Sequence, residues 1–491
     1  MKDILSFHVG GFGVATGIAY WQQLCYEHGI DFATGRVIPA QPPLGGTNDN
    51  ASSRAVSIND DALYNIRSAF YEKSDGCYAP KSIFADLDLM SIEKLQRMPS
   101  CFDQRSFIGE QGDGTGSNAA ASRYNPESTT VRDRCMHEAR RIVEQCDDSM
   151  GFIYSHALGG GAGSGLTATI ASHVQESYPS ERLIAFALLP SAIPDQHPSE
   201  IVTQALNCVF AMNTLHYTQS ATVCMDNAGL QSALASLDPG LVKGSAAGYS
   251  AENALVAKVM SAATSGCRFK GQPAMDFHKL DNNLVNTPQL HYCSAHYSRI
   301  SIPQPDAQRS GLHTTRLVMG AFSNDTRLLS VTPSHPTLKG GDVVMTGALS
   351  FRHDAAVGLG ALDVQAALAA ALRDRTIDQQ VSWHIPSPFT YGIVPESRRR
   401  RLNVDYPLSA ECTSFVNHTS IRHHFQHLLT QFKLVDKKNS FTHHFYRVGL
   451  DSMELREAEC SLVDVATYYG TLGERFSKPD GEDDAEAEEE E

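Results

Sequence analysis

The stretch "SFHVGGFGVATGIAYW", residues 6–21, sets three closely spaced glycines between two apolar runs. Residues Asp3–Val9 predict a buried strand and residues Val14–His28 predict a helix. The glycines therefore lie on a turn from strand to helix, where bare main chain can approach a phosphate and the helix N-terminus attracts an anion. This pattern predicts a nucleotide site, although a tight turn that binds nothing is the simpler explanation of this segment alone.

Two further glycine clusters strengthen the nucleotide interpretation. A predicted strand, Gly151–Leu158, runs into "GGGAGSG" (Gly159–Gly165) and then a helical stretch, and a third strand, Leu183–Pro190, follows. This order predicts a doubly wound parallel sheet that binds ligands at the carboxyl ends of its strands. The other cluster is "GDGTGSN" (Gly112–Asn118). Five glycines in seven residues suit packing poorly, so phosphate contact is favoured for Gly159–Gly165.

A nicotinamide dinucleotide site is disfavoured. Such a site requires an acidic residue at the end of a second strand, about 20 residues after the glycines. Asp31 lies at a suitable distance along the sequence, but it follows "YEHGI". That segment predicts a helix that ends with Gly29 in the C′ position.

Composition narrows the classes of function. The chain has 491 residues, enough for two or three domains, and no apolar run long enough to span a membrane. No signal-peptide pattern follows Met1, and the eleven cysteines form no CxxC pair, so a cytosolic protein with reduced thiols is expected. The net charge of −15 argues against nucleic acid as a partner.

Two segments are predicted to lie outside the folded core. Residues 38–60, rich in Pro, Gly, Asn and Ser, predict a long surface loop. Residues Asp480–Glu491, "DGEDDAEAEEEE", include nine acidic side chains and predict a disordered tail. The tail serves either solubility or the attraction of basic partners.

Motifs along nearly the whole chain resemble those of tubulins. "HVGGFGVATGIAYWQQLCYEHGID" resembles the tubulin amino terminus, and "GGGAGSG" resembles the signature GGGTGSG. "MDNAGL", "CRFKGQ" and "GLDSMELREAECSLVDVATYY" resemble IDNEAL, LRFPGQ and the final tubulin helix in the same order, and an acidic tail follows. The resemblance implies an α/β fold: a doubly wound GTP-binding domain (1–226), an α+β intermediate domain (227–416), a carboxy-terminal helical layer (417–478) and the acidic tail (479–491).

The resemblance also assigns site residues for GTP or GDP with Mg²⁺. Asn227 and Asn253 match the amides that bind guanine, and Tyr249 matches the aromatic that stacks on it. Glu200 lies at the ribose position, and Glu72 on the magnesium side. The full set of expected nucleotide contacts is Gly10, Gly11, Phe12, Gly13, Glu72, Gly114, Thr115, Gly116, Ser117, Gly159, Gly160, Gly161, Ala162, Gly163, Glu200, Asn227, Tyr249 and Asn253. Without the resemblance, each of the named polar residues also fits an ordinary structural role.

The phosphate end departs from the tubulin pattern. Side chains that contact the nucleotide in the family are replaced at five positions, namely Gly11, Ala15, Ser117, Ala157 and Ala162. Each replacement removes roughly 0.5 to 1.5 kcal/mol of hydrogen bonding, while the backbone cradle is kept. Phe12 adds bulk near the phosphates or the base. Nucleotide binding is therefore expected, at reduced affinity.

The hydrolysis loop of the family corresponds to "GQPAMDFHK", residues Gly271–Lys279. In tubulins this loop acts on the nucleotide of the neighbouring subunit, and its terminal glutamate is replaced by lysine in β-tubulin. Here Asp276 is kept, Ala274 replaces an asparagine and Lys279 stands at the glutamate position. A protonated lysine cannot accept a proton from water, so this loop is expected not to trigger hydrolysis in a neighbour.

Two clusters remain open. His423 and His427 have the i, i+4 spacing of a zinc site, but exposed helix positions are favoured. "SRRRRL", with Arg398–Arg401, fits a nuclear-localisation or anion patch, but a solvated loop is favoured.

The expected protein is a divergent tubulin that is neither an α nor a β subunit. Because the departures from the tubulin pattern cluster in the phosphate and hydrolysis loops, one of the rarer zeta, delta, epsilon or eta classes is expected, with the class left open. The resemblance to these classes implies a location in the cytoplasm and cytoskeleton, with centrioles, basal bodies or the axoneme of cilia as candidate sites. It would stack longitudinally on α- or β-type tubulin or on itself. Two alternatives stay open: a GTPase whose hydrolysis is triggered by a partner tubulin, and a nucleotide-free pseudo-tubulin that acts as a binding protein.

Overall fold

The structure is a computed structural model. It describes residues 3–38, 66–110, 118–146, 150–192, 201–237, 249–271, 273, 275–302, 310–330, 342–354, 359–373, 388–396 and 408–476.

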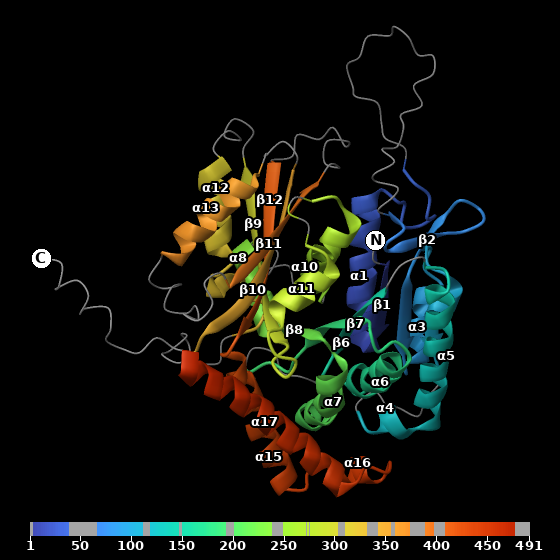
Figure 1. Ribbon diagram of the computed structural model, residues 1–491. Coiled ribbons are helices and arrows are strands. Elements are labelled where there is room, and N and C mark those ends of the chain that lie inside the picture. Colours follow the sequence, from blue (N-terminus) through green and yellow to red (C-terminus); the bar gives the residue numbers. More distant parts are fainter. Residues whose placement is uncertain are drawn as a thin grey trace, which may run out of the picture.

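One ten-stranded sheet forms the centre of the molecule (Figure 1). Its order is β11-β10-β12-β9-β8-β7-β6-β1-β4-β5. Every pair from β5 to β9 is parallel, whereas β12 is antiparallel to both β9 and β10. The strands are β1 (Asp3–Val9), β4 (Ser82–Asp86), β5 (Phe107–Gly109), β6 (Met150–Ala157), β7 (Arg182–Leu188), β8 (Ala221–Met225), β9 (Tyr292–Ile302), β10 (Val344–Asp354), β11 (Phe389–Glu396) and β12 (Leu408–His418). The predicted α/β fold with a doubly wound parallel sheet is confirmed.

Helices cover both faces of this sheet, which explains why β1 is buried at all seven residues. Leu5 and Phe7 of β1 pack in one apolar cluster with α5, α6, α7, α15 and α17. Ile4, which points to the opposite face, packs with α1, α3, α8, α10 and α11. These helices are α1 (Gly10–His28), α3 (Leu89–Gln96), α5 (Pro126–Val143), α6 (Thr167–Ser177), α7 (Gln204–Thr218), α8 (Asn227–Leu237), α10 (Ser250–Arg268), α11 (Phe277–Leu284), α15 (Ile421–Lys437) and α17 (Ser452–Phe476).

The remaining described elements are smaller or lie against the second half of the sheet. α12 and α13 form a third apolar cluster with β10, β11 and β12. Their bounds, with the short elements, are α4 (Ala121–Tyr124), α12 (Ser310–Gly320), α13 (Ala361–Leu372), α16 (Thr442–Tyr446), the π-helix η3 (Ala162–Leu166), the 3₁₀ helices η1 (Gln104–Ser106) and η6 (Asn324–Thr326), and the separate hairpin of β2 (Phe70–Glu72) and β3 (Tyr78–Pro80).

Helix α1 differs from the prediction at its start and agrees at its end. It begins at Gly10 rather than at Val14, because Val9 is extended and the glycines after it continue directly into the helix. At the other end Gly29 has φ +71°, the left-handed conformation expected of a C′ glycine. The side chain of Asp31 accepts a hydrogen bond from Thr34 in the following turn, so it does not end a strand of the sheet.

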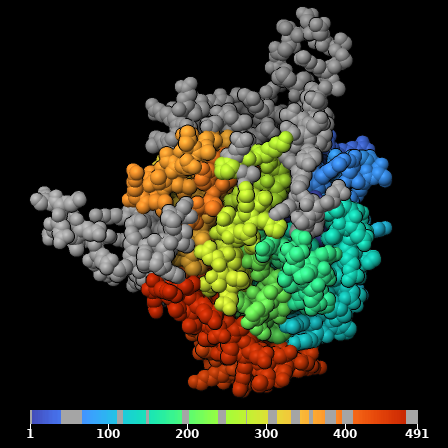
Figure 2. Space-filling model, viewed as in Figure 1, coloured from blue at the N-terminus to red at the C-terminus, as the bar shows by residue number. Residues whose placement is uncertain are grey.

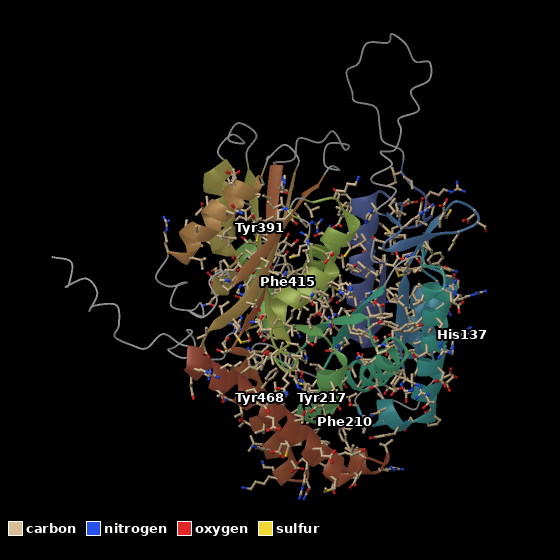
Figure 3. All side chains as sticks on the ribbon, in the orientation of Figure 1. His137, Phe210, Tyr217, Tyr391, Phe415 and Tyr468 are labelled. Carbon is tan, nitrogen blue, oxygen red and sulfur yellow. The ribbon has the colours of Figure 1, made fainter. Side chains whose placement is uncertain are left out.

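The carboxy-terminal helices α15, α16 and α17 gather at one end of the molecule beside α7, and appear red in Figure 2. Figure 3 labels Phe210 and Tyr217 of α7 and Tyr468 of α17 at this end, with Phe415 of β12 nearer the centre. Among the described residues, no helix combines the length and the apolar character that a membrane span requires.

Candidate functional site

The first and second glycine loops touch each other at Gly10 and Gly163. Gly10 has φ +72°, and a Cβ on it would lie 2.8 Å from the backbone nitrogen of Gly163. The turn from β1 into α1 therefore lies directly against the turn from β6 into η3, at the carboxyl ends of two neighbouring parallel strands. The structure thus brings together two of the predicted phosphate-binding loops.

The glycines of these loops divide into two kinds. Gly13 packs against the carbonyl of Ser155, and Gly163 packs against the backbone of Ala157, so that a Cβ would collide with main chain at either position. Gly11 and Gly160 instead have open space where a Cβ would lie. The expectation that the glycines of residues 159–165 serve packing poorly is therefore wrong in part, because Gly163, like Gly13, is required for contact between strand and helix.

Two helix starts at this edge have no side-chain cap. Val9, the N-cap residue of α1, and Gly161, the N-cap residue of η3, make no side-chain cap hydrogen bond, and neither first turn contains an acidic residue. The first amides of a helix have no acceptor within it, and their partial positive charge favours an anion. The geometry therefore suits the phosphates of a nucleotide.

Asn207 joins the second glycine cluster to the residue directly after the third cluster, and sequence reasoning missed it. Its side chain is buried on α7; Nδ2 donates to the carbonyl of Gly159 at 3.0 Å, and Oδ1 accepts from the backbone of Ala119 at 2.9 Å. Asn118 in turn caps the following turn, where its Oδ1 accepts from the backbone of Ala120 at 2.9 Å. No sequence signal distinguishes Asn207 from any other polar residue of a helix.

The predicted guanine end lies where α1, α8 and α10 meet. Asn227 begins α8, and Asn253 lies on α10, where its Oδ1 accepts a hydrogen bond from Thr16 of α1 at 3.2 Å. Within the described residues the amide nitrogen of Asn253 has no hydrogen-bond acceptor. Tyr249 precedes α10 and is 59% exposed, which leaves a ring face open. An amide with an open donor beside an open ring suits a purine edge and face.

Asp226 fixes the turn that presents Asn227. Its Oδ1 accepts from the backbone nitrogens of Gly229 at 2.9 Å and of Ser330 at 2.7 Å. Asp226 is therefore a helix cap that also anchors a distant segment. Sequence reasoning missed this role, although an aspartate directly before a helix is a recognisable cap signal.

Several expected contacts have other surroundings or lie outside the described residues. Phe12 packs partly buried against the apolar cluster on the α1 face of the sheet. Ala162 is buried in η3. The remaining members of the third loop and the ribose position, namely Gly114, Thr115, Gly116, Ser117 and Glu200, lie outside the described residues, as do Arg398–Arg401, residues 39–60 and Asp480–Glu491.

The predicted metal-binding positions are Glu72 for Mg²⁺ and, as a less favoured zinc site, His423 and His427. Glu72 is exposed in β2 and faces Arg67 at 3.8 Å. Over the described ranges, no group of three His, Cys, Asp or Glu side chains is placed to hold a metal ion. His423 Nε2 lies 2.9 Å from Asp342 Oδ2, whereas His427 Nε2 lies 2.9 Å from Gln431 Nε2. Both histidines are partly buried rather than exposed, and they have different partners, so their geometry does not favour zinc.

The hydrolysis-loop positions lie at the opposite end of the sheet from the glycine loops. Asp276 caps α11, accepting from the backbone of Lys279 at 2.8 Å, and Lys279 is exposed. A Cβ on Gly151, near the amino end of β6, would lie 2.8 Å from the ring of Phe277, the first residue of α11. Since β6 has 8 residues, the two ends are roughly 25 Å apart.

Comparison with known proteins shows similarity to a family of nucleotide-binding proteins, in line with the geometry of the glycine loops. Residues 3–235 match the family model "Tubulin/FtsZ family, GTPase domain". The chain is 27% identical to the tubulin beta-1 chain of Colletotrichum graminicola over 503 aligned residues, covering 100% of both chains. It is 27% identical to the tubulin beta-1 chain of Chondrus crispus, with coverage of 96% and 94%, and 26% identical to the tubulin beta chain of Saccharomyces cerevisiae, with coverage of 100% and 96%.

Proposed function

We propose that the chain is a divergent tubulin outside the α and β classes, which the match of residues 3–235 to the Tubulin/FtsZ GTPase-domain model supports. It binds GTP or GDP and serves as a cytoskeletal subunit that stacks longitudinally on α- or β-type tubulin or on itself. Its identity of only 26 to 27% to the β-tubulins named above supports a separate class.

The observation that carries this proposal is the opposition of two sites on one sheet. The glycine loops occupy the carboxyl ends of β1 and β6, and α11 with Asp276 and Lys279 lies at the amino ends of β6 and β7, where Asp281 pairs with Arg182 at 3.3 Å. A subunit with this geometry cannot apply its own α11 to its own nucleotide. It can do so only across a head-to-tail contact.

The nucleotide is held by main chain at one end and by side chains at the other. The uncapped starts of α1 and η3 receive the phosphates, and Asn227, Asn253 and Tyr249 receive guanine. Mg²⁺ accompanies the phosphates, with Glu72 on its side of the site. The free energy of nucleotide binding can thereby favour assembly. Only stacked subunits bring the glycine loops of one subunit against α11 of the next.

Two experiments test the proposal. Full-length protein, purified without added nucleotide and denatured by heat, is expected to release guanine nucleotide in a stoichiometric amount, measured by ion-exchange chromatography. Release of none, with no uptake of added GTP, would favour the nucleotide-free pseudo-tubulin instead. Co-sedimentation with polymerised α/β-tubulin then tests assembly, with bovine albumin as a control for trapping.

The second candidate function is a GTPase that depends on a partner. It is favoured by the same geometry, because a partner whose loop ends in glutamate can reach the open nucleotide end of this chain. Accelerated phosphate release on mixing with α-tubulin favours this candidate, whereas binding without release favours a purely structural role.

Location and tail contacts complete the proposal. The cellular place is the cytoskeleton, at centrioles, basal bodies or the axoneme, and basic partners bind the acidic residues Asp480–Glu491. Light microscopy of the tagged full-length chain tests the location against a centriole marker, and uniform cytoplasmic signal contradicts it.

A further inference from the structure

A connected set of buried polar side chains lies beneath the first turn of α1. Trp21 Nε1 lies 3.1 Å from His8 Nε2 and 3.2 Å from Ser6 Oγ. His8 Nδ1 lies 2.6 Å from Ser155 Oγ, which in turn lies 3.1 Å from the carbonyl oxygen of Gly13. None of the four side chains is more than 1% exposed. The set therefore links β1, β6 and α1 through direct hydrogen bonds.

The chemistry of these groups fixes the direction of each hydrogen bond. The indole N–H of Trp21 can only donate, and both His8 Nε2 and Ser6 Oγ accept from it. A neutral imidazole carries its proton on the other nitrogen, so Nδ1–H of His8 donates to Ser155 Oγ. Burial lowers the pKa of His8 to about 3 and keeps the ring neutral. The hydroxyl proton of Ser155 is then directed to the carbonyl of Gly13, and every member has one defined role.

Packing fixes the ring of His8 as well. A Cβ on Gly17 would overlap this ring, so Gly17 allows the helix to lie directly on it. On another side the ring stacks on Phe84, with centroids 4.9 Å apart. Gly13 likewise lets α1 rest against the main chain of Ser155. The height and rotation of α1 over the sheet therefore depend on these contacts.

We propose that the hydrogen-bonded series Trp21–His8–Ser155 is the positioning device of the phosphate end: it holds the first turn of α1 so that the amides of this turn face the nucleotide. This inference rests on the proposed function, since it assumes a nucleotide at these amides. Val9 supplies no side-chain cap, so the turn is held by Ser155 from β6 rather than by a residue of its own. The three side chains are positioning residues, because they reach the ligand through Gly13.

The test is nucleotide affinity of the full chain, measured by calorimetry with GTP, GDP and guanosine. Ser155→Ala is expected to weaken GTP and GDP binding about tenfold. Its effect on guanosine is expected to be small, because the guanine contacts lie on α8 and α10. The control is Ser414→Ala: Ser414 is also a buried strand serine, and its hydroxyl donates to the carbonyl of Ala321 at 2.7 Å, far along the sheet at β12. Ser414→Ala is expected to lower thermal stability similarly and to leave GTP affinity unchanged.

A second pair of variants separates the hydrogen bond from packing. His8→Asn keeps an N–H donor near the position of Nδ1, whereas the isosteric His8→Leu has none. We expect His8→Asn to bind GTP more tightly than His8→Leu, and equal GTP affinity of the two variants overturns the role of the hydrogen bond.

Each outcome is decisive. Equal GTP affinity of wild type and Ser155→Ala, or an equal loss in Ser414→Ala, overturns the positioning role while the proposed function stands. A loss that is the same for guanosine as for GTP overturns it too. A wild-type chain that binds no guanine nucleotide overturns both.

Discussion

At the scale of single residues, the glycines of the two loops that meet at Gly10 and Gly163 have separate physical tasks. Gly10 and Gly13 let main chain touch main chain, and Gly10 also needs a positive φ. Gly11 has neither constraint, because open space surrounds its missing Cβ. The position of a glycine within the loop, rather than the number of glycines, therefore decides how much a substitution lowers the free energy of unfolding.

Gly10→Ala is expected to destabilise the protein by at least about 2 kcal/mol, since a left-handed alanine alone costs roughly 1–2 kcal/mol and the contact with Gly163 adds to it. Gly11→Ala is the matched control and should leave stability unchanged or slightly higher, because alanine favours helix. Urea unfolding followed by circular dichroism measures both. Equal urea midpoints for Gly10→Ala and Gly11→Ala would contradict the different roles given to these two glycines.

Asn227→Ala and Asn253→Ala are each expected to weaken GTP binding about tenfold, because each removes a side-chain amide from the purine edge. Calorimetry measures the change. Asn282→Ala, on the exposed surface of α11, is the control and should bind like wild type. Unchanged affinity in the Asn227 and Asn253 double variant would end the guanine assignment.

The residues that sequence could indicate are those whose type is diagnostic. Glycine runs between a strand and a helix identified the loops that meet at Gly10 and Gly163. Asn207 and Ser155 could not be found in this way, because their roles depend on partners 48 and 142 residues distant. Contacts so far apart in the chain leave no local pattern.

At the scale of elements, a buried ion cluster joins α1, α10 and β10. Glu27 of α1 accepts from Arg268 at 2.7 Å and from Arg352 at 2.6 Å. Ser261 donates to the same carboxylate at 2.6 Å. Burial alone would raise the pKa of Glu27, but Arg352 and Arg268 overcome it and hold the pKa well below its usual range. The carboxylate thus ties α1, the helix that follows the first glycine loop, to β10.

Glu27→Gln is expected to destabilise the protein by roughly 3–5 kcal/mol near neutral pH, since it replaces the buried carboxylate that pairs with Arg268 and Arg352 by a neutral amide. A depressed folded pKa gives stability that is complete above the unfolded value, about 4.3, and is lost as the pH falls below it. Urea unfolding at pH 7 and pH 4 should therefore show that the free energy of unfolding falls less between these two pH values in the variant than in wild type. Glu93→Gln, on the exposed surface of α3, is the control. Parallel pH profiles would contradict this account.

The elements themselves were largely predictable. β1, β6 and β7 form within two residues of their predicted bounds, because buried apolar runs flanked by glycine or proline leave few alternatives. The start of α1 was misplaced because glycine is a poor helix former by propensity, whereas here close packing against β6 decides. The sequence did not indicate that the parallel sheet continues from β8 to β9 and β12. These strands pair across distant segments of the chain, and no local pattern encodes such pairing.

At the scale of the whole molecule, the separation of glycine loops from α11 predicts behaviour that needs a neighbour. In self-assembled protein, Lys279→Glu is expected to accelerate phosphate release at least about tenfold, because a carboxylate can accept a proton from the attacking water and lysine cannot. Lys279→Gln, which removes the charge without adding a base, is the control and should match wild type. The rate should rise with protein concentration. A concentration-independent rate would contradict action between subunits.

The parallel strands run from the α11 end to the glycine-loop end, so a filament stacked through these ends has its axis along the strands. Tension in such a filament pulls neighbouring strands past one another and loads their ladders in shear. Many hydrogen bonds then share the force at once, instead of opening one after another. A single sheet of ten strands thereby gives each subunit a high resistance to extension along the filament axis.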